Sequence, residues 1–303
     1  MNIVMLGHSG VGKTTYMASM YGRLQKPIKG FRLKAQDTGS HEYLLQLAAD
    51  IRKGIYPMAT DQRASYRFQL EYEGESVLPF TWVDYRGGAL RETQNSPGAN
   101  QLVKDLQAAD GILLFCDSAT LKKGRSLKSE IGRMIMLASR ALESVDRLLP
   151  LVIALTKYDL VGSISGDVRS VVMSMDDVML EPFMGMIEAV GASENVQGTI
   201  IPISCGQKPI NVQLPVLFAL YIGIAMKGAT LEEQFEGEMA RAELYKNNAG
   251  WWDNFVSVLK QEPSFGEMAQ KQYALAGKTY LETQKIIKPA TALLEYLEHL
   301  PSF

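Results

Sequence analysis

The sequence is poor in features that mark particular classes of protein. It contains only two cysteines, Cys116 and Cys205, and two thiols without metal-ligand spacing predict neither a disulfide-stapled protein nor a zinc site. It has no excess of positive charge, because its formal net charge is -2 and its densest basic run is only Lys122, Lys123 and Arg125. We interpret that run as a solvated loop and expect no nucleic-acid partner.

A membrane-spanning segment and a signal peptide are also missing from the pattern. The run from Leu214 to Met226 is apolar and uncharged, but it is shorter than the roughly 20 residues that a bilayer requires. We therefore expect a buried helix there and no transmembrane segment. The first residues lead directly into a glycine-containing stretch, without the basic start of a signal peptide. A cytoplasmic protein is expected.

Residues 1–228 alternate short β-branched runs with amphipathic segments, which predicts an α/β domain with a mostly parallel sheet covered by helices. Two of the runs are separated only by Glu73-Gly74-Glu75, so we expect one antiparallel hairpin. Strands are expected at residues 2–6, 31–35, 66–72, 78–84, 111–117, 151–156 and 199–204. Helices are expected to follow Lys13, Ser40, Ser126, Val168 and Val212, the second of them over residues 40–53.

The strand pattern stops after this domain, so residues 229–303 are expected to form a C-terminal helical extension. Thr230-x-x-Glu233 and Ser264-x-x-Glu267 have the spacing of a capping box, which marks the start of a helix. Apolar side chains recur at helical spacing around Trp252 and around Leu293, so these helices must cover an apolar surface. Packing on the α/β domain and binding of a partner protein both explain them.

Residues 7–14 match the phosphate-binding pattern G-x-x-x-x-G-K-[ST] between an apolar strand and a helical segment, the context that this loop requires. Its glycines let backbone N–H groups surround the β-phosphate, and the helix directs its positive end at the same anion. We expect Lys13 to bridge the β- and γ-phosphates, Thr14 to bind Mg²⁺ and Thr15 to reach the α-phosphate. The predicted phosphate-binding residues are Gly10, Val11, Gly12, Lys13, Thr14 and Thr15.

A second metal ligand is expected where a neighbouring strand ends. Asp84 closes the apolar run 78–83 and begins Asp84-Tyr85-Arg86-Gly87, which has the pattern D-x-x-G. We expect Asp84 to hold Mg²⁺ and the backbone N–H of Gly87 to approach the γ-phosphate, so that this loop senses whether the phosphate is present. The phosphate motifs alone do not choose between GTP and ATP.

Thr156-Lys157-Tyr158-Asp159 follows the apolar run 151–155, and here the sequence resembles the Ras-like GTPases of the TRAFAC class, whose guanine motif is N-K-x-D. The resemblance implies that Asp159 accepts hydrogen bonds from the guanine N1–H and 2-amino groups, and that Lys157 lies along the ring. Thr156 replaces the family's Asn. Ser204-Cys205-Gly206 looks like the family's S-A-x loop, in which the N–H of Cys205 would meet the guanine oxygen. A solvent-exposed turn is the alternative for Lys157 and Asp159.

The resemblance also implies a switch I threonine that reaches Mg²⁺ and the γ-phosphate only in the triphosphate state. We assign this role to Thr60, because Thr38 precedes the helix expected from Ser40; an exposed loop hydroxyl is the alternative. The inserted helix, the loop before Thr60 and the D-x-x-G-G switch look like the bacterial double-GTPase type over residues 1–228. A three-layer P-loop GTPase fold is implied, and with one P-loop a double arrangement would need a second protein.

The predicted chemistry has one weak point. In Ras-like enzymes a glutamine directly after D-x-x-G orients the attacking water, and here that position is Gly88. Slow hydrolysis is therefore expected, with Arg86 or a partner protein stabilising the transition state; an exposed, inactive Arg86 is the alternative. A switch cycling between GTP and GDP is the leading hypothesis, and a non-hydrolysing scaffold that recruits a partner through its C-terminal helices is the second. Lys157 and Asp159 oppose an ATP-dependent kinase or transport ATPase.

Overall fold

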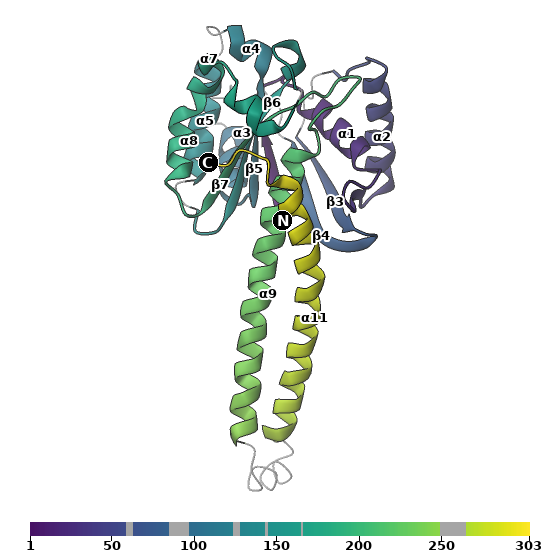
Figure 1. Cartoon of the computed structure of the whole chain (residues 1–303), viewed down its shortest axis with the longest axis vertical. Helices are drawn as coiled ribbons and strands as arrows, with labels where there is room; N and C mark the ends of the chain where they lie inside the picture. Colours follow the sequence, from purple (N-terminus) through teal and green to yellow (C-terminus); the bar gives the residue numbers. More distant parts are fainter. Residues whose placement is uncertain (59–62, 85–96, 124–127, 143–144, 165, 249–264) are drawn as a thin grey trace. The chain divides into compact units, whose positions relative to one another are not determined.

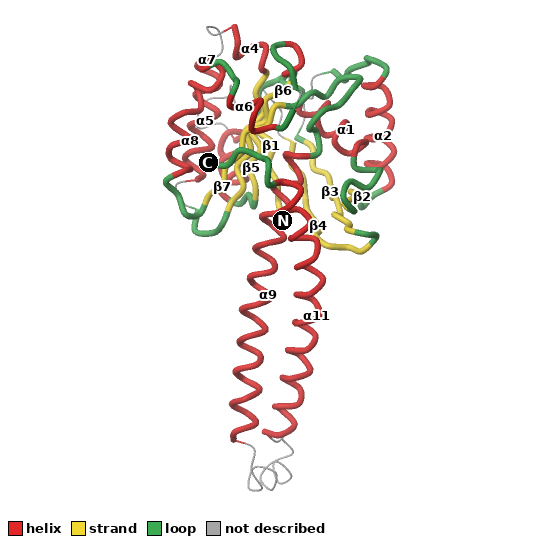
Figure 2. Tube along the Cα trace, viewed as in Figure 1, coloured by secondary structure: helices red, strands yellow, loops and turns green. Residues whose placement is uncertain are grey.

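The computed structural model describes residues 1–303 except 59–62, 85–96, 124–127, 143–144, 165 and 249–264. The chain forms two compact units. The first comprises Met1–Gly223 together with Leu293–Phe303, and the second comprises Ile224–Ala292. All of the strands belong to the first unit, whereas the second is helical (Figure 2).

The first unit is built on a seven-stranded sheet of order β2-β3-β4-β1-β5-β6-β7, with helices packed around it (Figure 1). Only β3 runs in the direction opposite to the other strands, and the predicted hairpin joins it to β4. All seven predicted strands are present, and their ends move by at most three residues. The strands are β1 (Asn2–Leu6), β2 (Phe31–Ala35), β3 (Ala64–Tyr72), β4 (Glu75–Asp84), β5 (Gly111–Asp117), β6 (Leu149–Thr156) and β7 (Val196–Pro202).

The helices differ more from the prediction. The inserted helix α2 begins at Thr38 rather than Ser40, because the Asp37 side chain caps it by accepting a 2.7 Å hydrogen bond from the Ser40 N–H. Helices α3, α4, α7 and α8 were not predicted. The α-helices of the first unit are α1 (Lys13–Arg23), α2 (Thr38–Arg52), α3 (Pro97–Gln107), α4 (Ser118–Lys123), α5 (Lys128–Leu142), α6 (Val168–Met173), α7 (Asp177–Leu180) and α8 (Met184–Gly191), with short 3-10 helices η2 (Tyr158–Leu160) and η3 (Glu181–Phe183).

The core lies around the central strands. All eight residues of β6 are buried, as expected for a strand covered on both faces. Helix α1 is anchored on the sheet by Tyr16, whose ring lies 4.9 Å from that of Phe115 and 6.0 Å from that of Trp82 between centroids. These three aromatic side chains are fully buried, so they fix the start of α1 against the ends of β4 and β5.

The second unit is formed by α9 (Leu214–Asn248) from Ile224 onward and by α11 (Phe265–Leu297) up to Ala292. Rings of Phe235 and Tyr280 lie 5.8 Å apart, and Gly228 lies against Ile286, so the two helices run antiparallel. The capping box predicted at Thr230 is wrong: its hydroxyl donates a 3.0 Å hydrogen bond to the Met226 carbonyl inside α9. The predicted domain boundary at 228–229 therefore falls within one continuous helix.

By length and composition alone, Leu214–Leu244 is apolar enough to cross a membrane, and half of its most apolar window is buried. The first part of that segment is the run for which a buried helix was predicted. Leu214, Leu217 and Leu220 are each at most 2% exposed. This part of α9 is thus a core helix of the first unit.

Candidate nucleotide-binding site

The P-loop turns from β1 into α1 at the centre of the sheet. Gly10 and Gly12 have φ angles of 80° and 97°, in the left-handed region that favours glycine, and a Cβ on either would meet open space. Gly7 is required for a different reason, because a Cβ there would lie 2.8 Å from the Phe115 carbonyl oxygen. The loop is therefore held close to β5, and its glycines border an open space.

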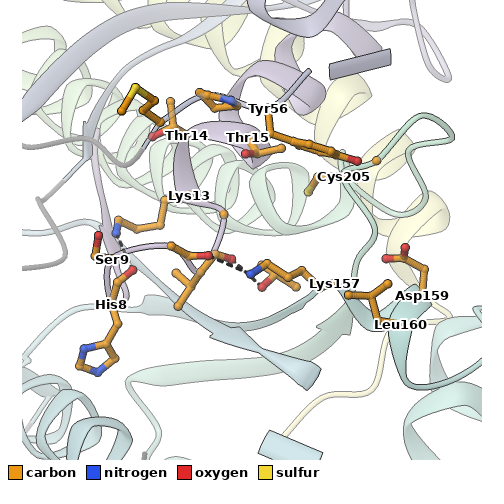
Figure 3. A pocket seen from close by; sticks show the side chains of 17 residues that line it. His8, Ser9, Lys13, Thr14, Thr15, Tyr56, Lys157, Asp159, Leu160 and Cys205 are labelled. Carbon is orange, nitrogen blue, oxygen red and sulfur yellow. Dashed lines mark hydrogen bonds between the residues drawn. The ribbon is translucent and has the colours of Figure 1, made fainter. Parts of the chain in front are cut away.

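That space is a cavity of about 510 Å³ at the carboxyl edge of the sheet, within the usual size range of small-molecule sites. Figure 3 shows the side chains around it, with Lys13 on the P-loop side and Asp159 on the opposite side. The lining residues are His8, Ser9, Gly10, Val11, Gly12, Lys13, Thr14, Thr15, Tyr56, Pro57, Met58, Thr156, Lys157, Asp159, Leu160, Cys205 and Gly206.

Lys13 and Asp84 form the charged centre of the phosphate end. The Lys13 Nζ donates hydrogen bonds to the carbonyls of Gly7 at 2.7 Å and His8 at 3.4 Å. Burial lowers the pKa of Lys13, although attraction to Asp84 opposes this shift. Asp84 pairs in register with Met5 of β1 and is 2% exposed, so it lies beside the P-loop without lining the cavity itself.

Burial raises the pKa of Asp84 from 3.8 to about 6, even though the charge of Lys13 and a hydrogen bond with Thr14 lower it. Its Oδ1 has no hydrogen-bond partner in the part of the chain that the structure describes. A buried carboxylate oxygen without a donor fits a hard divalent cation, which prefers oxygen ligands. Asp84 and the neighbouring Thr14 hydroxyl thus match the donor set of a Mg²⁺ site.

Thr156, the first residue of the predicted guanine motif, holds the loops together. Its hydroxyl is buried and donates at 2.7 Å to the Val11 carbonyl, while the Cys116 carbonyl lies 3.2 Å away. The hydroxyl therefore joins the end of β6 to the P-loop. Although Thr156 lines the cavity, its polar atom is occupied by protein partners.

The Lys157 side chain extends from the predicted guanine motif to the P-loop. Its Nζ forms a 2.6 Å ion pair with Asp117 and a 2.9 Å hydrogen bond with the Gly10 carbonyl, and the second bond is drawn in Figure 3. Its backbone has a φ of 54°, which turns the chain into η2 and brings the exposed Asp159 to the cavity wall. An acceptor and an alkyl stem therefore border the same end of the cavity.

The Ser204-Cys205-Gly206 loop is only partly at the site. Cys205 and Gly206 line the cavity, whereas Ser204 is 3% exposed and exchanges two backbone hydrogen bonds with Ile210. Burial raises the pKa of the Cys205 thiol well above its usual range, so the thiol stays protonated. Ser204 closes the base of the loop and does not reach the cavity.

Sequence reasoning missed one group of cavity residues and one residue outside the cavity wall. Tyr56, Pro57 and Met58 line it from the loop after α2, and the Tyr56 hydroxyl approaches Gly206 so closely that a Cβ there would lie 3.4 Å away. Asp117, the partner of Lys157, was also missed. The available signal for Asp117 was its position, because it ends β5 as Asp84 ends β4.

The residues predicted for the γ-phosphate and the attacking water lie outside the described part of the chain. Thr60 falls within residues 59–62, and Arg86, Gly87 and Gly88 fall within residues 85–96. Their roles remain predictions. Lys13, Thr14, Thr15, Lys157, Asp159 and Cys205 are brought to one cavity, but their nucleotide contacts also remain predictions.

Residues 4–146 match the family described as Double-GTPase 1. Over these residues, just under half of the chain, the sequence is similar to the P-loop GTPase domains of the double-GTPase 1 family. The match includes the P-loop and Asp84, and it ends before Lys157, Asp159 and Cys205. The family match therefore includes the residues at the phosphate end of the cavity and leaves out those at the guanine end. No curated protein matches the chain.

Several solved structures are similar to this chain over 72% to 73% of its length. A bacterial selenocysteine-specific elongation factor, EF-Sec, is 14% identical, with 73% of this chain aligned to 28% of that one and a TM-score of 0.36. The SRb-GTP/SRX complex of the signal recognition particle receptor from Chaetomium thermophilum is 12% identical, covering 72% and 96% of the two chains, with a TM-score of 0.41. A probable GTP-binding protein, engB, is 12% identical, covering 73% and 98%, with a TM-score of 0.38. At these identities and TM-scores the likeness supports no conclusion about this chain.

Proposed function

We propose that this protein binds GTP with Mg²⁺ and hydrolyses it slowly, as a switch whose two nucleotide states are recognised by another protein. The GTPase family assignment supports guanine-nucleotide binding. The observation that carries the proposal further is the buried Asp84 oxygen without a partner, next to Lys13 and Thr14. That combination provides an acidic metal ligand and a phosphate-binding cation at one end of a nucleotide-sized cavity.

We assign the two ends of the cavity to different parts of the nucleotide. At the phosphate end, the N–H groups of residues 10–15 and Lys13 bind the phosphates, and Thr14 and Asp84 hold Mg²⁺. When bound there, Mg²⁺ would supply positive charge that offsets the negative charge of the phosphates. At the other end, the exposed Asp159 accepts from the guanine N–H groups, and the Lys157 stem lies beside the ring.

Hydrolysis is proposed to be slow because Gly88 has no side chain to orient water. Arg86, or an arginine from a partner, would stabilise the transition state, and such a residue typically raises the rate by about 10³ to 10⁵. Single-turnover measurements on the isolated chain test this part, with an expected rate below about 10⁻² s⁻¹. Fast turnover that Arg86→Ala leaves unchanged would contradict it.

Equilibrium binding of labelled GTP, GDP and ATP, each with Mg²⁺ or with EDTA, tests the nucleotide assignment. We expect GTP and GDP to bind in Mg²⁺ and ATP to bind at least about 100-fold more weakly, because adenine lacks the N1–H and 2-amino donors that Asp159 would accept. Lys13→Met should abolish binding, and the surface control Lys34→Met should not. A preference for ATP would overturn the guanine assignment.

A second candidate is a nucleotide-binding scaffold that does not hydrolyse GTP and recruits a partner through its helices. Gly88 favours it, and so does the separate compact unit formed by residues 224–292. The two candidates differ in one measurement: a scaffold shows no GTP turnover with or without its partner.

A further inference from the structure

A second cavity, of about 300 Å³, lies in the first unit beside the nucleotide site. Helix α1 contributes Ser19, Gly22 and Arg23, which share one face at spacings of three and four residues, and Lys26 follows the helix. Helix α2 contributes Leu45, Ala48 and Arg52, again on a single face, and the loop after β7 contributes Gly206 and Pro209. Gln25 completes the lining.

The cavity is positively charged. Arg23, Lys26 and Arg52 line it, and no acidic side chain is among its described lining residues. None of the three cations forms a salt bridge with any residue that the structure describes. Asp50 of α2 is not a lining residue and instead contacts Lys53 at 3.6 Å and Gln46 at 3.0 Å. The three cations are exposed to solvent, and no described residue pairs with their charge.

The positions of two of these cations at helix C-termini explain part of the positive charge. Arg23 and Arg52 lie in the last turns of α1 and α2, where a cation offsets the negative end of the helix. That account leaves Lys26 unexplained, because it lies beyond α1, and it does not explain the cavity. The helices approach closely at Gly22 and Ala48, where a Cβ on Gly22 would lie 2.8 Å from the Ala48 Cβ, so the cavity is bounded there by tight packing.

We propose that this cavity binds a small phosphate-bearing anion, separately from the nucleotide site. Two guanidinium groups and an ammonium group suit the several oxygens of a di- or triphosphate, because arginine binds phosphate through paired N–H donors. The buried floor at Ser19 and Ala48 excludes a bulky ligand. This proposal goes beyond GTP binding and requires a second, distinct ligand.

The site is connected to guanine recognition. Gly206 lines both cavities, and the Ser19 hydroxyl donates a 3.2 Å hydrogen bond to the carbonyl of Cys205. An anion bound between α1 and α2 would therefore affect the position of the loop containing Cys205 and Gly206, which also borders the nucleotide cavity. By linkage, the anion changes the affinity for GDP by the same factor by which GDP changes the affinity for the anion.

The test is calorimetric titration of inorganic tripolyphosphate into protein saturated with Mg·GDP, so that the P-loop is occupied. We expect one site in the wild type and at least about tenfold weaker binding in Arg23→Gln/Lys26→Gln/Arg52→Gln. The matched control, Lys34→Gln/Lys123→Gln/Arg140→Gln, removes the same charge from exposed positions of the same unit and should bind normally. Absence of binding to the wild type, or equal loss in both triple variants, would overturn the proposal.

Two further arms separate the possible failures. If Mg·GDP itself does not bind, the proposed function fails, and the titration is repeated in Lys13→Gln, which removes the anion site of the P-loop. If an oligoglutamate peptide binds as tightly as tripolyphosphate and is lost in the cavity variant, the cavity recognises negative charge alone, which would overturn the phosphate assignment.

Discussion

At the residue scale, burial of the Asp84 carboxylate disfavours its charged form. Burial raises its pKa to about 6 in the folded protein, against 3.8 in an exposed reference. The folded state therefore binds this proton more tightly than the unfolded state. The stability contributed by this group is fully present below pH 4, falls as the pH rises to about 6, and is absent above it. At neutral pH the charged form costs about 3 kcal/mol.

Asp84→Asn is therefore expected to stabilise the nucleotide-free protein while removing Mg²⁺-dependent binding. The raised pKa already includes the attraction of Lys13, so neutralising Asp84 should add about 2–3 kcal/mol at pH 7.5 and only about 1 kcal/mol at pH 4.5. Urea unfolding in EDTA at both pH values measures the difference between variant and wild type. The control is Asp177→Asn, on the exposed surface of α7. Equal stability differences at the two pH values would contradict the prediction.

Asp159 gives a residue-scale test of base recognition. Its carboxylate borders the cavity and is exposed, so Asp159→Ala should leave the fold intact. Losing hydrogen bonds to a charged acceptor costs about 1.5–3 kcal/mol, or roughly 10- to 100-fold in GTP affinity. Inosine triphosphate lacks the 2-amino group, and the variant should bind it and GTP equally. Retention of the wild-type preference for GTP over inosine triphosphate in Asp159→Ala, with Asp177→Ala as control, would remove Asp159 from the site.

At the element scale, the ends of three parallel strands create the site. β4 ends at Asp84, β5 at Asp117 and β6 at Thr156, and parallel pairing with β1 and with one another brings them to one edge. The Thr156 hydroxyl then bonds the end of β6 to the P-loop at 2.7 Å. The edge therefore depends on a few bonds between loops of separate elements.

Thr156→Val tests that dependence. It keeps the side-chain shape but leaves the Val11 carbonyl without its partner, which should cost about 1–3 kcal/mol of stability. GDP affinity should fall as well, because the P-loop loses a support. Thr156→Ser keeps the hydroxyl and should restore most of both quantities. Urea unfolding and GDP titration measure them, and a Thr156→Val protein with wild-type stability would contradict the role of this bond.

The elements also show what the sequence can and cannot predict. Strands were predictable because buried β-branched runs such as 111–117 are bounded by glycine and polar residues. Helices α4 and α7 have six and four residues, too few for a 3.6-residue period to appear. Thr230 was misread because a capping box is defined over four residues, whereas α9 continues through it. Tyr56 was missed because nothing local shows that its loop meets Gly206.

At the scale of the whole molecule, the chain leaves the first unit after Gly223 and returns to it at Leu293. Leu293 and Leu297 are buried there, and Phe303 exchanges two backbone hydrogen bonds of 2.9 and 3.0 Å with Gly198 of β7. Apolar spacing predicted that these leucines cover a surface. It did not specify which surface, because a helical stripe carries no information about its partner.

Gly198 shows how closely this returning segment fits. A Cβ on Gly198 would overlap the Phe303 ring, so Gly198→Ala should cost about 1–3 kcal/mol through overpacking. Phe303→Ala removes the obstacle, and the double variant should therefore be more stable than the sum of the single losses predicts. Gly185→Ala is the control, because a Cβ there meets open space within α8. Urea unfolding of the four proteins of the cycle measures the coupling. Strictly additive losses would mean that residues 198 and 303 act independently, whereas positive coupling would mean that a segment reached only through the second unit stabilises the edge of the GTPase sheet.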